Sequence, residues 1–178
     1  MTKSAPRSFA RTTGLVYLSY FTLAISGLLL VHWKMVPGIV ANSISNVLYA
    51  ATTLLLYRLF RRADGALALV AAALSLVGCA TDSLEHFHLI PAAVSPLLFF
   101  ALFCILLGVL VLRSRFLPGW LGWPLVAAGV GWLAYLVPAV ALYGKFIIFP
   151  LGFVAEFELM LWLIIKGVDE PRWAALPA

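Results

Sequence analysis

One apolar stretch of this sequence is interrupted by an unusual run of ionisable residues, Asp82–His88, which holds two carboxylic acids and two histidines. On a continuous helix, side chains three or four residues apart share a face, so Asp82, Glu85 and His86 would lie together. His88 would follow at the end of the same helix. Because carboxyl and imidazole groups can exchange protons, the run predicts an acid–base site.

A second group of acids, Glu156 and Glu158, lies in the middle of another apolar stretch. A carboxylate in hydrocarbon costs about 3 kcal/mol or more, so an acid at this depth needs a partner or a function. Two residues apart on a helix, the side chains point about 200° from each other. We expect Glu156 to face an interior cavity, and Glu158 to face a neighbouring helix or a second chain.

These two groups of acids predict a division of labour between carboxyl groups. Desolvation favours the neutral form of a carboxyl group, whereas a wetter carboxyl group next to a histidine stays ionised. We therefore expect Glu156 to donate a proton, and Asp82 or Glu85 to act as the base or to stabilise charge. A substrate that reaches this site from the lipid must be lipophilic. Isomerisation, cyclisation or epoxide opening of an isoprenoid-like chain fits, which makes an isomerase, cyclase or hydrolase the enzyme class expected.

Further polar residues fall in or near the same half of the apolar stretches, and we predict that they help to bind the substrate. They are Asn42, Asn46, Tyr49, Tyr135, Glu158 and His88. The opposite halves consist mostly of Leu, Val and Ala. This asymmetry predicts a polar pocket that opens outward or sideways and is closed below by an apolar plug.

A metal site is an alternative, because Glu85 and His88 have the Glu-x-x-His spacing of di-iron bundles. Such bundles need two copies of this motif and two further acids, and the sequence holds one copy. A mononuclear site built on Asp82, His86 and a remote carboxylate stays open. We nevertheless expect no metal and no cofactor.

Six apolar stretches, each long enough to cross a bilayer, account for nearly all of the 178 residues. Hydrophobic residues make up 64% of the chain and charged residues 11%, compared with about 25% charged residues in soluble domains. We predict an all-α polytopic membrane protein, a six-transmembrane-helix bundle that forms a single domain over residues 1–178. The spans expected are about 12–33, 42–60, 66–86, 93–112, 121–142 and 146–165.

Basic residues divide ten to two between the two sides of such a bundle, which places both termini in the cytoplasm. The ten are Lys3, Arg7, Arg11, Arg58, Arg61, Arg62, Arg113, Arg115, Lys166 and Arg172, and the two are Lys34 and Lys145. Because these charges stand at helix ends and form no basic face, the net charge of +5 does not indicate a nucleic-acid partner.

Four motifs carry a resemblance to a known family: Arg11–Leu18, Leu54–Phe60, Arg113–Pro118 followed by Leu121-Gly122, and Glu156 with Leu161–Gly167. Together they resemble a bacterial family of six-helix integral membrane proteins catalogued as a domain of unknown function, DUF4386. The resemblance implies the six-helix topology and a location in the bacterial plasma membrane, but no activity. Family members often have glycine where this chain has Ala155, and the Asp82–His88 run is not a family feature.

Two other classes of function stay open from the sequence. Intramembrane acids and histidines also build proton-coupled transporters and ion or small-molecule pathways. A non-catalytic membrane subunit is the third class, with Glu158 at a contact between chains. The partners expected are a lipophilic small molecule, membrane lipids and a second copy of the chain in a homo-oligomer.

Overall fold

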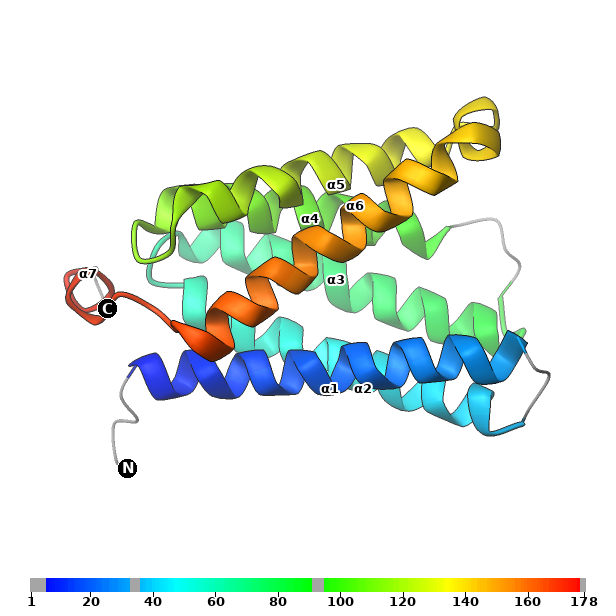
Figure 1. Ribbon diagram of the computed structural model, residues 1–178, viewed down its shortest axis with the longest axis horizontal. Coiled ribbons are helices and arrows are strands. Elements are labelled where there is room, and N and C mark those ends of the chain that lie inside the picture. Colours follow the sequence, from blue (N-terminus) through cyan, green and yellow to red (C-terminus); the bar gives the residue numbers. More distant parts are fainter. Residues whose placement is uncertain (1–5, 33–35, 91–94, 177–178) are drawn as a thin grey trace.

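A computed structural model describes residues 6–32, 36–90 and 95–176, and all regular structure within these residues is helical (Figure 1). The elements are α1 (Pro6–His32), α2 (Val36–Phe60), α3 (Gly65–His86), α4 (Pro96–Ser114), the 3-10 turn η1 (Gly119–Leu121), α5 (Gly122–Tyr135), α6 (Pro138–Ile165) and α7 (Glu170–Ala174). Trp33 and Ala93, at which the sequence places one end of the first and fourth spans, lie outside the described residues.

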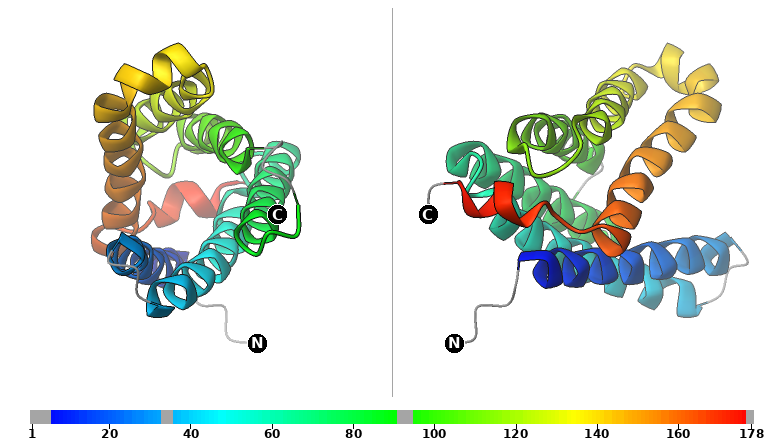
Figure 2. Two further views of the ribbon diagram at one scale, coloured as in Figure 1. Left: turned by 90° about the vertical axis from the view of Figure 1, so that its right-hand side faces the viewer. Right: turned by 60° about the vertical axis from the view of Figure 1, so that its left-hand side comes forward.

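The helices α1 to α6 form a closed ring. Each packs against its neighbours in the sequence, and α6 returns to pack against α1. Short turns between consecutive helices favour this antiparallel order. The left view of Figure 2 looks along the axis of the bundle and shows the six helices arranged around it. Side chains from all six helices line a common cavity within the ring.

Helix α6 crosses the ring obliquely, and this tilt decides where the bundle is tight (Figure 1). Its C-terminal half packs against α1, where Phe21 meets Phe153 with ring centroids 5.4 Å apart. Its N-terminal half packs against α5, where Phe149 meets Trp132 at 4.9 Å. Helices α1 and α6 therefore separate toward the end of the ring at which α6 begins.

The boundary between α5 and α6 corrects the sequence prediction. We expected a fifth span over 121–142, but α5 ends at Tyr135 and α6 begins at Pro138. Pro138, which falls inside that expected span, is instead the first residue of α6. A proline at this position loses no hydrogen bond, because the first N–H groups of a helix have no partner within it. Pro150 lies inside α6.

Four of the described helices are long and apolar enough to cross a membrane: Pro6–Leu30, Gly65–His86, Pro96–Ser114 and Phe146–Ile165. Helix α5 has 14 residues, and α2 carries many polar side chains. The structure is thus an all-helical protein with four helices of membrane-spanning length and composition.

The end of the ring that carries most of the arginines is tied together by hydrogen bonds. The guanidinium groups of Arg7 and Arg11 donate to the carbonyl oxygens of Lys166 and Ile165 at the end of α6, at 3.1 and 3.3 Å. Beyond α6, the indole N–H of Trp173 donates to the carbonyl oxygen of Leu59 at 3.3 Å. The segment after α6 therefore closes this end, which we call the basic end.

Candidate functional site

A cavity of about 370 Å³ opens inside the ring, away from the basic end. Each of the six long helices contributes at least one side chain to its lining. One residue from each helix, in order, is Tyr20, Asn46, Asp82, Cys104, Trp132 and Glu156. We call this cavity the pocket. Asp82 and Glu156 come from α3 and α6, which are not neighbours in the ring, so only a shared central space brings them together.

Glu156 is held in the pocket by three hydrogen-bond donors from three helices. The hydroxyl of Tyr17 donates to Oε2 at 2.5 Å, and the hydroxyl of Tyr49 donates to Oε1 at 3.5 Å. The thiol of Cys104 also donates to Oε1, at 3.5 Å. Tyr17 and Cys104 are buried, whereas Glu156 itself is half-buried because it faces the pocket. The ion pairs between described side chains are Arg113–Asp64 and Arg172–Asp169. Glu156 therefore forms no ion pair with a described basic side chain.

This arrangement suits a group that gains and loses a proton. A phenol hydroxyl can donate to a carboxylate or accept from a carboxylic acid, so both protonation states of Glu156 keep their hydrogen bonds. Hydrogen bonds to an ionised group are stronger than those between neutral groups. Tyr17 and Tyr49 can therefore stabilise the negative charge that appears on Glu156 once its proton leaves.

Asp82 lies at the wetter part of the pocket, and Asn46 positions it. The side-chain amide of Asn46 donates to Oδ2 of Asp82 at 3.2 Å and to the hydroxyl of Ser83 at 2.7 Å. It also donates to the carbonyl oxygen of Cys79 at 2.9 Å, which fixes α2 against α3. Asp82 remains exposed, and the imidazole of His86, one turn later on α3, lines the same pocket. Asn46 thus has a positioning role within the protein.

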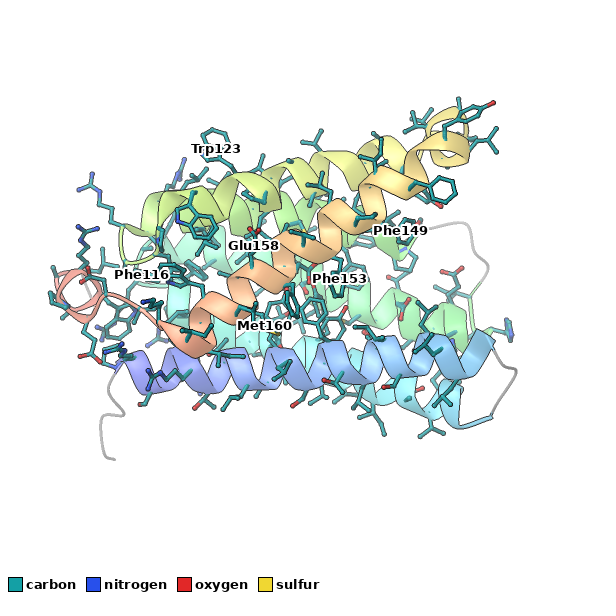
Figure 3. The ribbon with its side chains drawn as sticks, in the orientation of Figure 1. Phe116, Trp123, Phe149, Phe153, Glu158 and Met160 are labelled. Atoms are coloured by element: carbon teal, nitrogen blue, oxygen red, sulfur yellow. The ribbon has the colours of Figure 1, made fainter. Side chains whose placement is uncertain are left out.

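Six of the residues singled out from the sequence line the pocket: Asn42, Asn46, Tyr49, Asp82, His86 and Glu156. Glu158 is not among the lining residues, and Figure 3 shows it on the side of α6 that faces α5. This is the division between Glu156 and Glu158 that their spacing predicts. Tyr135 packs edge-on against Phe149, with ring centroids 5.4 Å apart, and does not line the pocket.

The remaining two candidates, Glu85 and His88, do not line the pocket, although Glu85 lies within α3 together with Asp82 and His86. The helix ends at His86, and the backbone of His88 has a φ of 56°, which takes it out of the helical path. Glu85 and His88 therefore do not share a helix face. Within the described residues, no three His, Cys, Asp or Glu side chains come together as a metal site.

Sequence reasoning missed Tyr17, Tyr20, Cys104 and Trp132, which complete the site. Tyr17 and Tyr20 are three residues apart on α1, and both contact Tyr49, at 6.2 and 4.6 Å between ring centroids. One feature of the sequence could have identified the two tyrosines, because a tyrosine hydroxyl in a membrane helix needs a hydrogen-bond partner. Cys104 gave no such signal, because a lone cysteine in a helix behaves as a small apolar residue.

Apolar side chains fill the ring between the pocket and the basic end. The fully buried ones include Leu59, Phe60, Leu107, Leu110, Leu159, Met160 and Leu163. A cavity at this level measures about 10 Å³. The hydroxyls of Thr53 and Ser75 lie here at 2.7 Å from each other, so each satisfies the other. We call this region the plug.

An all-helical ring with apolar, membrane-length helices around a polar pocket defines an integral membrane protein with an internal ligand-sized cavity. Residues 83–167 match the family described as Domain of unknown function (DUF4386). This match confirms the family resemblance, and it contains the motifs Arg113–Gly122 and Glu156–Gly167, whereas Arg11–Leu18 and Leu54–Phe60 precede it. The matched part includes Cys104, Trp132 and Glu156, whereas Tyr17 and Asp82 precede it. No curated protein and no solved structure matches the chain.

Proposed function

We propose that the protein is an integral membrane enzyme that isomerises or cyclises a lipophilic substrate through proton transfer by Glu156 and Asp82. The observation that supports this most is the shared pocket, because it brings two carboxyl groups from non-adjacent helices to one cavity of about 370 Å³. Ligand pockets of about 300–1,000 Å³ are typical for small molecules. The two carboxyl groups have different surroundings, which is the usual basis for separating an acid from a base.

In the proposed reaction, Glu156 begins protonated and donates its proton to one carbon of a carbon–carbon double bond. The π bond breaks, a C–H bond forms, and the neighbouring carbon becomes positively charged. The carboxylate of Asp82 then removes a proton from an adjacent carbon, and a new double bond forms. Glu156 and Asp82 exchange protons with water at the pocket mouth to restore the starting state, so no oxidant or reductant is needed. An epoxide would be opened in the same way: Glu156 protonates the epoxide oxygen, one C–O bond breaks to leave a hydroxyl group and a carbocation, and Asp82 removes a proton from the adjacent carbon to form a double bond.

The proposal includes a six-span arrangement in the bacterial plasma membrane, with both termini cytoplasmic. The ring order supports it, because α2 and α5 lie between helices of membrane-spanning character. The arginine-rich turns support it as well, since basic residues favour the cytoplasmic side. In this orientation the pocket belongs to the outer half of the membrane, and a substrate enters from the lipid where α1 and α6 separate.

Transport is the main alternative function, and the plug favours an enzyme over a transporter. A transport path would need polar groups or water through both halves of the ring. The plug instead fills the region toward the basic end with buried Leu, Phe and Met side chains. A second copy of the chain could pack near Glu158 in a homo-oligomer, but the proposed chemistry does not depend on it.

The reaction can be tested without a known substrate. We would place the purified protein in vesicles of bacterial lipid extract in D₂O, and measure carbon-bound deuterium in the lipids by mass spectrometry. The proposal expects a labelled lipophilic compound with the wild type and none with Glu156→Gln or Asp82→Asn. Glu158→Gln is the matched control, since it removes an acid two residues away that does not line the pocket, and it should keep full labelling. Wild-type protein that labels no compound, or labelling that survives Glu156→Gln, would overturn the proposal.

A further inference from the structure

We infer that the pocket binds lipophilic organic cations, with a quaternary ammonium or similarly weakly hydrated positive centre between Asp82, Glu156 and a set of aromatic rings. This inference rests on the proposed function, because it names the substrate class of the same site as a molecule that carries, or develops, positive charge. Three features of the pocket support it: its charge, its aromatic walls and its size.

The charged groups of the pocket are unbalanced. Asp82 and Glu156 both line it, and no lysine or arginine stands among the described residues of its lining. Of the lining side chains, His86 is the basic one, and it lies one turn from Asp82 on α3. Glu156 is held by Tyr17, Tyr49 and Cys104, which are neutral donors. Carboxylates in a site of low dielectric attract a ligand of opposite charge strongly.

Aromatic rings from four helices surround the same space. The rings of Tyr20 and Tyr49 are 4.6 Å apart at an angle of 51°, and Phe100 meets Tyr49 edge-on at 5.5 Å and 85°. Trp132 adds an indole from α5. Rings inclined to one another in this way present faces and edges to the cavity from several directions. Cations held against aromatic faces are stabilised by the ring quadrupole, and quaternary ammonium groups are recognised by such cages.

A quaternary ammonium fits these walls better than the other candidate ligands. An inorganic cation would need several oxygen ligands in place of its hydration shell. An anion would be repelled by Asp82, and more strongly once Glu156 has lost its proton. In that ionised state a neutral lipophile would leave the two negative charges uncompensated, whereas the neutral substrate of the proposed reaction binds while Glu156 is protonated. A volume of about 370 Å³ holds a trialkylammonium group together with a short apolar arm. The same surroundings would stabilise the carbocation of the proposed reaction.

The inference is tested with a pair of molecules that share a shape and differ in charge. Phenyltrimethylammonium is the cation, and tert-butylbenzene is its neutral counterpart. We would measure binding of radiolabelled phenyltrimethylammonium to the protein in nanodiscs of zwitterionic lipid, with empty nanodiscs subtracted. The expected result is saturable binding with one site per chain, which tert-butylbenzene at the same concentration does not displace.

Matched variants tie this binding to the pocket. The cation binds the state in which Glu156 has lost its proton, so Glu156→Gln and Asp82→Asn should each weaken binding about tenfold or more by removing one charge next to the cation. Glu158→Gln and Glu85→Gln remove acids on the same two helices that do not line the pocket, and they should bind as the wild type does. Trp132→Leu removes one ring without changing charge, and about a fivefold loss is expected from the cation–π contribution. Cation binding to Trp132→Leu still tests the inference if Glu156→Gln fails to fold.

The outcomes separate this inference from the proposed reaction. Saturable, Glu156-dependent binding without deuterium labelling would support the cation site and overturn the acid–base enzyme. Labelling without cation binding would overturn the inference and leave the enzyme standing. Binding that does not saturate, or that is equal in all five variants, would also overturn the inference.

Discussion

The two ends of the helical ring differ in how closely their helices approach. Toward the basic end, α4 and α5 meet at Gly108 and Gly122, where a Cβ atom on Gly108 would lie 2.6 Å from the carbonyl oxygen of Gly122. Toward the other end, α6 diverges from α1, and the α6 side chains Phe146 and Ile147 are exposed. Large apolar side chains fill the first region, whereas polar and acidic side chains line a cavity in the second.

This contrast indicates a division of roles between the two ends. Close packing of apolar side chains is the main source of stability in a helical bundle, and a polar cavity contributes less of it. The packed end can hold six helices in place while the other end stays open to a ligand. Substitutions at the packed end should therefore change stability most, and substitutions at the pocket should change ligand binding and chemistry.

The largest effect on stability is expected where α4 and α5 meet closely at Gly108. Gly108→Val would place a branched side chain against the backbone of α5, and overpacking of this kind costs about 3 kcal/mol. Gly65→Ala is the control, because no atom lies within 4 Å of a Cβ atom at Gly65. Thermal unfolding in detergent measures both variants. Equal unfolding temperatures for the two would contradict the account of the packed end.

A smaller effect is expected where the pocket meets the packed region. Tyr17→Phe removes the short hydrogen bond to Glu156 and leaves a carboxyl group with one donor fewer, which should lower the free energy of unfolding by about 2 kcal/mol. Tyr143→Phe removes a hydroxyl from an exposed ring and should change stability little. If both variants unfold at the wild-type temperature, Tyr17 does not hold Glu156 in the way described.

The plug offers a test of a single buried polar pair. Ser75→Ala should cost about 1 kcal/mol, because it leaves the hydroxyl of Thr53 without this partner. The double variant Thr53→Val with Ser75→Ala should cost less than the two single changes added together, since it leaves no unpaired group. A double-mutant cycle by chemical unfolding measures the difference. Strict additivity would show that the two hydroxyls do not interact.

The smallest effect is expected at the surface of the basic end. Arg113 pairs with Asp64 at 2.9 Å, but Arg113 is largely exposed, so Arg113→Met should cost about 0.5 kcal/mol or less. Asp64→Ala should cost about 1 kcal/mol, because Asp64 also caps α3 by accepting from the backbone N–H of Leu67 at 3.0 Å. A larger cost for Arg113→Met than for Asp64→Ala would contradict this ranking of the ion pair below the helix cap.

Much of the helical architecture follows from the sequence, because long apolar stretches separated by Gly, Pro and Arg leave few alternatives. The boundary between α5 and α6 does not, since apolar residues run without interruption through Pro138. A proline in such a run can kink one helix or begin the next, and the local pattern is the same in both cases. In the structure, α5 and α6 are two antiparallel helices that pack against each other, for example through Trp132 and Phe149. A single kinked helix could not form this contact.

The site was predictable in part for a similar reason. The spacing of Glu156 and Glu158 predicts that at most one of the two acids faces the interior, and the cost of a buried charge singles both out. The partners of Glu156 come from α1, α2 and α4, and a spacing rule within one helix carries no information about contacts between helices. The prediction for His88 depended on α3 continuing, and the helix ends two residues before it.

The central claim is that Glu156 lies in a pocket open to lipophilic molecules and can carry a proton there. Dicyclohexylcarbodiimide tests this directly, because it partitions into lipid and converts a protonated carboxyl group into a stable N-acylurea. We would treat the folded protein in membranes and locate the modified residue by peptide mass spectrometry. The account predicts modification at Glu156 that phenyltrimethylammonium slows. Glu156 that stays unmodified until the protein is unfolded would contradict it.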